Sequence, residues 1–186
     1  MGPASHARWR ERRDRLFGTH PQSALQPDRR DGFTGLAYYD YDRRLAVTGV
    51  VELEQAAVRE LDHSAEGTTR FVPIGTVHFD LLGAPRSLTL FWLDAYSGGL
   101  FLPFRDATSG TETYGGGRYL LDGAKSADLG GTGEELVLDL NFAYHPSCVH
   151  DPRWSCPLAP PENHLDVPVR GGERLAPASV EDLPHM

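Results

Sequence analysis

Residues 70–93, RFVPIGTVHFDLLGAPRSLTLFWL, contain the pattern that decides the fold. Val77 and Phe79 can point to one side of a strand, and the polar residues beside them to the other, as in a half-buried strand. The turn residues 83–85 (GAP) separate this strand from a second apolar run at 87–93. The stretch therefore predicts a β-hairpin.

Short apolar runs occur on both sides of this hairpin. They predict further strands at 45–51, 100–104, 118–121 and 135–144, and a short edge strand at 167–169. Gly (20 residues) and Pro (14 residues) are frequent, as expected where turns join short strands. About six or seven strands with little helix predict a mainly β fold, either an antiparallel sandwich or a partly open barrel.

The rest of the chain is expected to complete one domain over residues 1–186. A short N-terminal helix at 5–17 has one narrow apolar stripe and should pack on the edge of the domain. The β core and an irregular proline-rich segment then occupy 33–173, and 174–186 is expected to be a loose tail.

The formal net charge of −8 excludes several partner classes. A protein that neutralises nucleic-acid phosphates needs a surplus of basic residues, so no nucleic-acid partner is expected. No run approaches the ~18–20 apolar residues that cross a bilayer, so no membrane partner is expected. A cytoplasmic protein with reduced cysteines and no cofactor is the prediction.

The segment 104–119 is the first candidate for a site. Three consecutive glycines, Gly115–Gly117, usually mark a strained turn or a close approach of the backbone to another group. Arg118 follows them and could offer its planar guanidinium to a carboxylate or phosphate. The alternative is that the glycines form only a tight bend and that Arg118 pairs with Glu112 or Asp106.

The segment 139–164 is the second candidate. It contains both cysteines and five prolines, which pre-set the backbone of a long irregular stretch. Cys148, His150 and Cys156 are of the right types for zinc, but their spacing differs from that of common zinc motifs. Free buried thiols, a small disulfide loop and a nucleophilic cysteine remain alternatives.

Three strings resemble a known family: FTGLAYYDYD (33–42), LPFRDATSGTETYGGGRYL (102–120) and LNFAYHPSCVHDPRWSCPLAPPENHLDVPVRGGE (140–173). They are similar to the bacterial and archaeal family catalogued as domain of unknown function 1684. The resemblance implies no biochemical activity. His145 and His150 stand where that family usually has Asn and Tyr, which argues against a shared metal site that uses them. The residues that fall on matching positions are Cys148, Cys156, Arg118, Asp106, Asn141 and Glu162.

These observations favour a small-molecule pocket built from the segments 104–119 and 139–164, with an anionic ligand and with catalysis left open. The expected ligand-binding residues are Arg118, Tyr114, Asn141, Tyr144, Gly116 and Gly117, and the expected proton-transfer residues are Asp106, Glu112 and Glu162. One alternative is a non-catalytic protein-interaction module with Trp154 as an anchor. A weaker one is a metal site at Cys148, His150 and Cys156.

Overall fold

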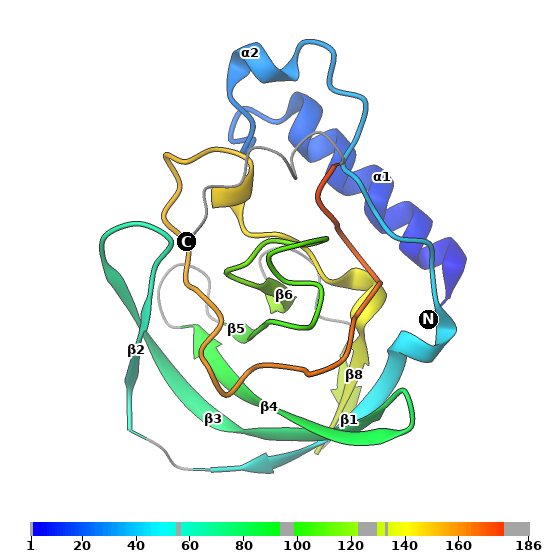
Figure 1. Cartoon of the computed structure of the whole chain (residues 1–186), viewed down its shortest axis with the longest axis vertical. Coiled ribbons are helices and arrows are strands. Elements are labelled where there is room, and N and C mark those ends of the chain that lie inside the picture. The colour runs from blue at the N-terminus through cyan, green and yellow to red at the C-terminus, as the bar shows by residue number, and fades with distance from the viewer. Residues whose placement is uncertain (1, 55–56, 94–98, 123–129, 133, 177–186) are drawn as a thin grey trace.

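The computed structural model describes residues 2–54, 57–93, 99–122, 130–132 and 134–176, and its described part is mainly antiparallel β-sheet (Figure 1). The strands are β1 (Ala46–Leu53), β2 (Arg59–Asp62), β3 (Thr68–Leu81), β4 (Ala84–Leu93), β5 (Gly99–Phe104), β6 (Arg118–Asp122), β7 (Gly131–Thr132) and β8 (Glu135–Asp139). They pair in the order β6-β5-β4-β3-β1-β8-β7, with β2 added to β3. The sheet curves into a half-barrel, so the prediction of a mainly β, partly open barrel is confirmed.

The predicted hairpin is formed by β3 and β4, which pair from Phe71 opposite Leu93 to Leu81 opposite Ala84. Its turn is Leu82-Gly83 rather than 83–85. Both turn residues have positive φ, 53° at Leu82 and 84° at Gly83. This is the dihedral signature of a type I′ turn, whose twist matches that of the strands it joins.

The helices are α1 (Pro3–Thr19), α2 (Pro27–Arg30) and the 3-10 turns η1 (Arg43–Leu45), η3 (Leu140–Phe142) and η4 (Ser147–Val149). The predicted N-terminal helix is confirmed, but it begins at Pro3 rather than at residue 5. A proline fits in the first turn of a helix, where the backbone N–H has no partner within the helix. Trp9 and Phe17 are buried and Leu16 is exposed. α1 and α2 lie at the end of the molecule away from β3 and β4 (Figure 1).

Two predicted strands differ from the structure. The strand expected at 135–144 stops at Asp139, because its carboxylate accepts the backbone N–H of Asn141 and starts η3. The edge strand expected at 167–169 is absent from the described sheet, since the Val169 N–H donates to Asp106 instead. The polar strand β2 and the two-residue β7 were not predicted.

Hydrogen bonds fix the C-terminal segment beyond residue 173, where the sequence predicted a loose tail. The N–H of Arg174 donates to the carbonyl of Ala37 and that of Leu175 to the carbonyl of Glu112. Leu175 is also buried. The expectation of a loose tail from residue 174 is therefore wrong for 174 and 175, and residues 177–186 lie outside the described part of the chain.

The main core fills the curve of the sheet. Phe71, Phe91 and Phe101 pack ring against ring there, and Tyr119 joins them at 4.7 Å from the Phe101 ring. The irregular segments after β5 and β8 lie within the open side of the sheet (Figure 1). These segments take the place of the strands that would close a full barrel.

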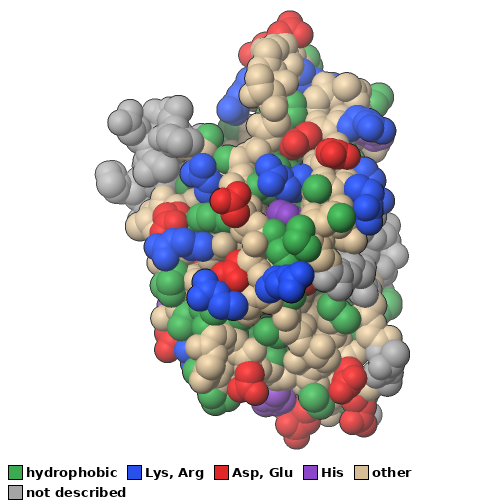
Figure 2. Space-filling view, turned by 90° about the vertical axis from the view of Figure 1, so that its right-hand side faces the viewer, with side chains coloured by type: hydrophobic (Ala, Val, Ile, Leu, Met, Phe, Trp, Pro, Cys, Tyr) green, Lys and Arg blue, Asp and Glu red, His purple; other side chains and the backbone are tan. Residues whose placement is uncertain are grey.

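The surface carries charges of both signs. On the face shown in Figure 2, basic side chains gather across the middle and acidic side chains at the lower end. None of the described helices is long and apolar enough to cross a membrane.

Candidate functional site

The two candidate segments lie side by side. The N–H of Arg105 donates to the carbonyl of Asn163 at 2.8 Å, and the N–H of Leu165 donates to the carbonyl of Arg105 at 2.8 Å. Further along, the N–H of Ala159 donates to the carbonyl of Gly116 at 3.0 Å. The proline-rich segment is thus fastened along the turn that connects β5 to β6.

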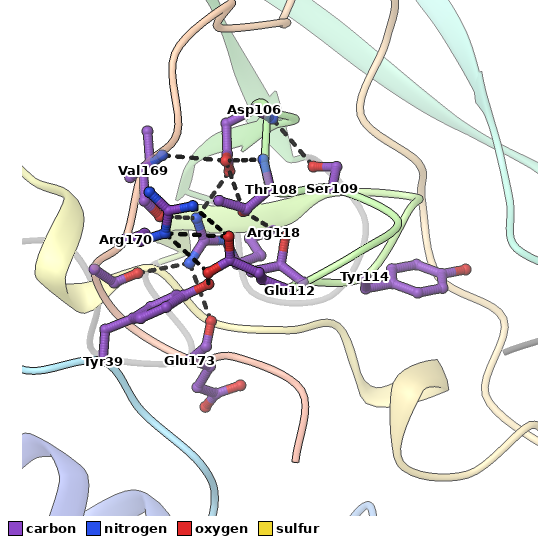
Figure 3. Close-up of polar contacts among 12 residues, drawn as sticks. Tyr39, Asp106, Thr108, Ser109, Glu112, Tyr114, Arg118, Val169, Arg170 and Glu173 are labelled. Carbon is purple, nitrogen blue, oxygen red and sulfur yellow. Dashed lines mark hydrogen bonds and ion pairs between the residues drawn. The ribbon is translucent and has the colours of Figure 1, made fainter. Parts of the chain in front are cut away.

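Arg118 is in the interior, not at the surface (Figure 3). Its Nη1 donates to the carbonyls of Gly171 and Glu173, and its Nη2 to the carbonyl of Val169 and to Asp106 Oδ2 at 2.8 Å. Four of the five guanidinium N–H donors are therefore used inside the protein. This geometry contradicts the expectation that Arg118 binds an external anion, and it bears out the alternative of pairing with Asp106.

Asp106 is equally enclosed, with 2% of its surface exposed. Its Oδ1 accepts from the N–H and hydroxyl of Thr108 and from the N–H of Val169, while Oδ2 accepts from Arg118. The donors of Thr108, Val169 and Arg118 thus enclose the carboxylate inside the protein. Asp106 is therefore a structural residue, contrary to its predicted proton-transfer role.

Glu112 pairs with Arg170 through both carboxylate oxygens. It also accepts from the Tyr39 hydroxyl at 3.0 Å (Figure 3). The hydrogen bond from the Arg170 guanidinium lowers the pKa of Glu112. Burial, together with the hydrogen bond to Glu112, raises the pKa of Tyr39 to about 12. Glu112 thus ties the 104–119 turn to other segments of the chain.

Two more predicted ligand residues are structural. Asn141 is fully buried and clamps the backbone of Asp42, accepting its N–H and donating to its carbonyl, each at 2.8 Å. Tyr144 is 2% exposed, and the Arg13 guanidinium lies 4.6 Å from the centre of its ring. Asn163, which the sequence analysis missed, clamps Thr89 in the same two-sided way.

A hollow of about 420 Å³ opens where the two segments meet β2. It is lined by β2 (Arg59, Glu60, Leu61, Asp62), by Arg105, Gly115 and Gly116, and by Leu158, Ala159, Pro160, Pro161 and Glu162. This volume lies within the ~300–1,000 Å³ range of small-molecule sites. Of the predicted site residues, Gly116 and Glu162 are in its lining.

The glycines explain how the turn fits against the proline-rich segment. Gly117 has a φ of +101°, and a Cβ there would come within 2.6 Å of the Phe104 carbonyl oxygen. A Cβ on Gly116 would come within 2.4 Å of the Tyr114 ring and 2.7 Å of Leu158. Both positions require glycine for close packing, and the resulting wall of the hollow exposes backbone at Gly115 and Gly116 rather than side chains.

Two arginines reach the hollow, and they differ in their pairing. Arg59 forms an ion pair with Glu162. Arg105 has a buried Nε without a hydrogen-bond partner, and its guanidinium forms no ion pair with any described residue. Neither arginine was singled out from the sequence.

The acidic residues of β2 do not cancel this charge. Alternate residues of a strand point to opposite faces, and Leu61 is buried. Arg59 therefore shares the inner face with Leu61, whereas the side chains of Glu60 and Asp62 belong to the other face. Glu60 accepts from the Thr68 hydroxyl there. By this alternation Arg59, Arg105 and Glu162 are the ionised side chains on the hollow side, although Glu60 and Asp62 are also part of the lining.

The cysteine and histidine candidates do not form a metal site. Among the described residues, no group of three or more His, Cys, Asp and Glu side chains is placed to hold a metal ion. His150 packs instead on Phe17, with the ring centres 4.6 Å apart. Burial lowers its pKa to about 3. Tyr114, expected in the ligand pocket, is absent from the lining of the hollow, and its backbone N–H donates to His145 Nε2 at 3.3 Å.

Comparison with known proteins places the chain in a family. The family described as "Protein of unknown function (DUF1684)" matches residues 31–174. The chain belongs to this family. A solution NMR structure of an uncharacterized protein from Haloarcula marismortui has the same fold, with a TM-score of 0.69 and 38% sequence identity over 92% of this chain and 93% of that one. No curated protein matches the chain.

In this member of the DUF1684 family, the matched region includes both walls of the hollow but not α1. α1 is nevertheless fastened to the matched region by a buried ion pair. Arg13 Nη2 lies 2.5 Å from Glu173 Oε1, and the two side chains are 9% and 1% exposed. The second oxygen of Glu173 accepts the N–H of His145 at 2.7 Å.

Proposed function

We propose that this protein binds a small anionic molecule in the hollow between β2 and the two candidate segments, with Arg105 as the anchor. The observation that carries the proposal is that the guanidinium of Arg105, in the lining of the hollow, has neither an ion pair nor a hydrogen bond to any described side chain or backbone group, and that its Nε is buried in this state. Leaving such a donor unpaired costs ~1–3 kcal/mol, more for a charged group. A carboxylate or phosphate oxygen entering the hollow would remove that cost.

The charge balance around Arg105 supports an anionic ligand rather than a cationic one. Arg59 is neutralised by Glu162, so Arg105 supplies the uncompensated charge. A guanidinium offers paired N–H donors in one plane, the arrangement that carboxylates and phosphates accept in bidentate fashion. The backbone at Gly115 and Gly116 leaves room for the ligand at the opposite wall.

Binding without a reaction is the function that these contacts favour. Asp106 and Glu112 lie outside the lining of the hollow, and Glu162, which is in it, pairs with Arg59. No carboxylate in the lining is therefore both unpaired and placed on the hollow side, as a proton-transfer group would be. We therefore propose a binding protein of the cytoplasm.

The alternative of a protein-interaction surface rests on Trp154, which is 43% exposed. Single exposed apolar side chains are normal on soluble proteins and do not by themselves indicate an interface. The small-molecule site has the stronger support because it joins a hollow of suitable size with an unpaired arginine.

Thermal unfolding in the presence of small anions tests the proposal. Phosphate, acetate and succinate are added to the wild-type protein, to Arg105→Ala and to Arg170→Ala, whose arginine pairs with Glu112 away from the hollow. A ligand that binds only the folded state raises its stability by mass action, by about 2.7 kcal/mol at 100 times Kd. We expect at least one anion to raise the Tm of the wild type and of Arg170→Ala but not of Arg105→Ala.

Ionic strength is held constant with sodium chloride, so that general salt effects are common to all samples. An increase in Tm that persists in Arg105→Ala would show that the anion binds elsewhere. The absence of an increase with all three anions would contradict an anion site in this hollow.

A further inference from the structure

A serine and a histidine are joined by a hydrogen bond at the end of β2, outside the lining of the hollow. His63 directly follows β2, and Ser155 belongs to the segment 139–164. Nδ1 of His63 lies 2.9 Å from the Ser155 Oγ, and Nε2 lies 2.5 Å from the hydroxyl oxygen of Thr69 on β3. Because a hydroxyl group engages each ring nitrogen, the direction of the imidazole is fixed.

Backbone contacts on both sides of this pair hold the end of β2 against the segment 139–164. The N–H of Ser64 donates to the carbonyl of Cys156 at 2.9 Å, and the N–H of Leu158 donates to the carbonyl of Asp62 at 2.8 Å. The Ser64 hydroxyl also accepts the N–H of Cys156 at 3.1 Å. The two stretches are therefore fastened without the serine–histidine bond, which is not needed to hold them together.

The order hydroxyl, imidazole, hydroxyl fits a nucleophile, a general base and a group that orients the base. A neutral imidazole has one N–H donor and one acceptor nitrogen. When Nε2–H of His63 donates to Thr69, Nδ1 is the acceptor and takes the hydrogen bond of the Ser155 hydroxyl. In that tautomer the imidazole is placed to remove the serine proton.

The serine oxygen can be reached from solvent, because Ser155 is exposed and His63 is partly exposed. The backbone N–H of Ser155 donates to no described group, whereas the N–H groups of Trp154 and Cys156 on either side of it are used inside the protein. An unpaired backbone N–H at the nucleophile is a donor that can stabilise a developing oxyanion. The nucleophile, its base and an oxyanion donor are thus present together.

We propose that Ser155 is a nucleophile that accepts acyl groups, with His63 as its general base and Thr69 as a positioning residue. The matching substrate class is a small carboxylic ester, because a serine oxygen activated by a neutral imidazole attacks a carbonyl carbon that carries a leaving group. Neither Ser155 nor His63 belongs to the lining of the hollow, so the proposal does not depend on anion binding there.

The chemistry balances in two steps. The Ser155 oxygen attacks the carbonyl carbon while its proton passes to Nδ1 of His63; the bond from that carbon to the alcohol oxygen then breaks, and the alcohol leaves with the proton. In the second step, water attacks the acyl carbon and gives a proton to the imidazole. The bond from the acyl carbon to Ser155 breaks, and the serine oxygen recovers a proton. The net change is an ester and water to an acid and an alcohol.

Hydrolysis of p-nitrophenyl acetate by the full chain tests the proposal, with Ser155→Ala and Ser87→Ala beside the wild type. Ser87 is a matched control, because it is exposed and lies opposite His78 in the register of β3 and β4, yet no hydrogen bond joins these two described side chains. We expect the wild type and Ser87→Ala to release p-nitrophenolate at least about tenfold faster than Ser155→Ala. Equal rates in the wild type and Ser155→Ala would overturn the proposal.

The covalent intermediate is examined directly by acid quenching during turnover, followed by intact mass and peptide mapping. We expect the wild type to carry an acetyl group on Ser155. His63→Gln keeps a polar side chain but removes the base, so it should react as slowly as Ser155→Ala. Acetyl groups found only on residues other than Ser155 would overturn the assignment of the nucleophile.

Two variants of Thr69 test the positioning role. Thr69→Val keeps the branched shape but removes the hydroxyl, so kcat should fall by roughly threefold to tenfold with little change in KM. Thr69→Ser returns the hydroxyl and should recover most of the loss. A hydroxyl that only supports the fold would leave kcat unchanged in Thr69→Val, and this result would overturn the role given to Thr69.

Discussion

Arg118 and Arg105 belong to the same turn between β5 and β6, yet their guanidinium groups have opposite surroundings. Arg118 is fully buried and holds Asp106 and three backbone carbonyls. Arg105 lines a hollow, and its buried Nε has no partner. Arg118 uses four of its five donors inside the protein and only its Nε is unpaired, whereas none of the donors of Arg105 has a partner among the described residues.

The difference teaches that the pairing of a charged side chain, not its type, indicates its role. A buried charge with all its partners present contributes to folding and is costly to disturb. A charge with a missing partner contributes little to folding, and the missing partner is a candidate ligand. Each variant below tests one side of this contrast.

The largest effect is expected for Arg118→Ala. It leaves the Asp106 carboxylate buried without its counterion and three carbonyls without a donor, which should lower the free energy of unfolding by about 3–5 kcal/mol. Urea denaturation measures the change. Arg118→Lys keeps the charge but not the planar set of donors, so its free energy of unfolding should lie between those of Arg118→Ala and the wild type. A loss below about 1 kcal/mol in Arg118→Ala would break the contrast.

A second test applies the same contrast to the buried His145 and the half-buried His150. His145 Nε2 accepts from the N–H of Tyr114 at 3.3 Å, whereas His150 Nε2 has no hydrogen-bond partner. Burial lowers the pKa of His150 to about 3, from 6.5 in an unfolded chain. Below pH 6.5 the unfolded chain therefore binds a proton that the folded protein does not, and stability falls as the pH falls toward 3.

His150→Phe removes this titration while keeping a ring against Phe17. Between pH 7 and pH 4.5 it should lose about 1–3 kcal/mol less stability than the wild type. Denaturation midpoints at a series of pH values give the comparison. Parallel pH profiles for the two proteins would show that His150 is not held in its neutral form.

The smallest effect is expected for Arg105→Ala. Because this side chain has no ion pair to lose among the described residues, the free energy of unfolding should fall by no more than about 0.5 kcal/mol, and loss of the unpaired Nε acts in the stabilising direction. Urea denaturation without added anions measures it. A large loss here would mean that Arg105 supports the fold, and it would remove the reason for treating it as a ligand anchor.

The sequence predicts most of the sheet because the strong strands carry their own signal. Alternation at Val77 and Phe79 identifies β3, and the apolar run after the turn identifies β4. β2 has the sequence RELD, with one apolar residue, and its pairing depends on β3 beside it. Such a strand is specified by tertiary contacts rather than by its own pattern.

The two candidate segments were expected to meet, from their glycines and prolines, and hydrogen bonds join them. The inward direction of Arg118 was not predicted, because it depends on the strand register. Phe104 is buried and lies opposite Arg118 across β5 and β6, so Arg118 points inward with it. Arg105, the next residue after Phe104, points the other way.

The ion pair between Arg13 and Glu173 determines how much of the chain must be kept together for study. A recombinant fragment cut to the family match, 31–174, would retain Glu173 and discard the helix that carries its counterion. The buried carboxylate would keep the N–H of His145 as a partner but would lose its counterion. For this protein the unit of expression and crystallisation is therefore larger than the region by which its relatives are recognised.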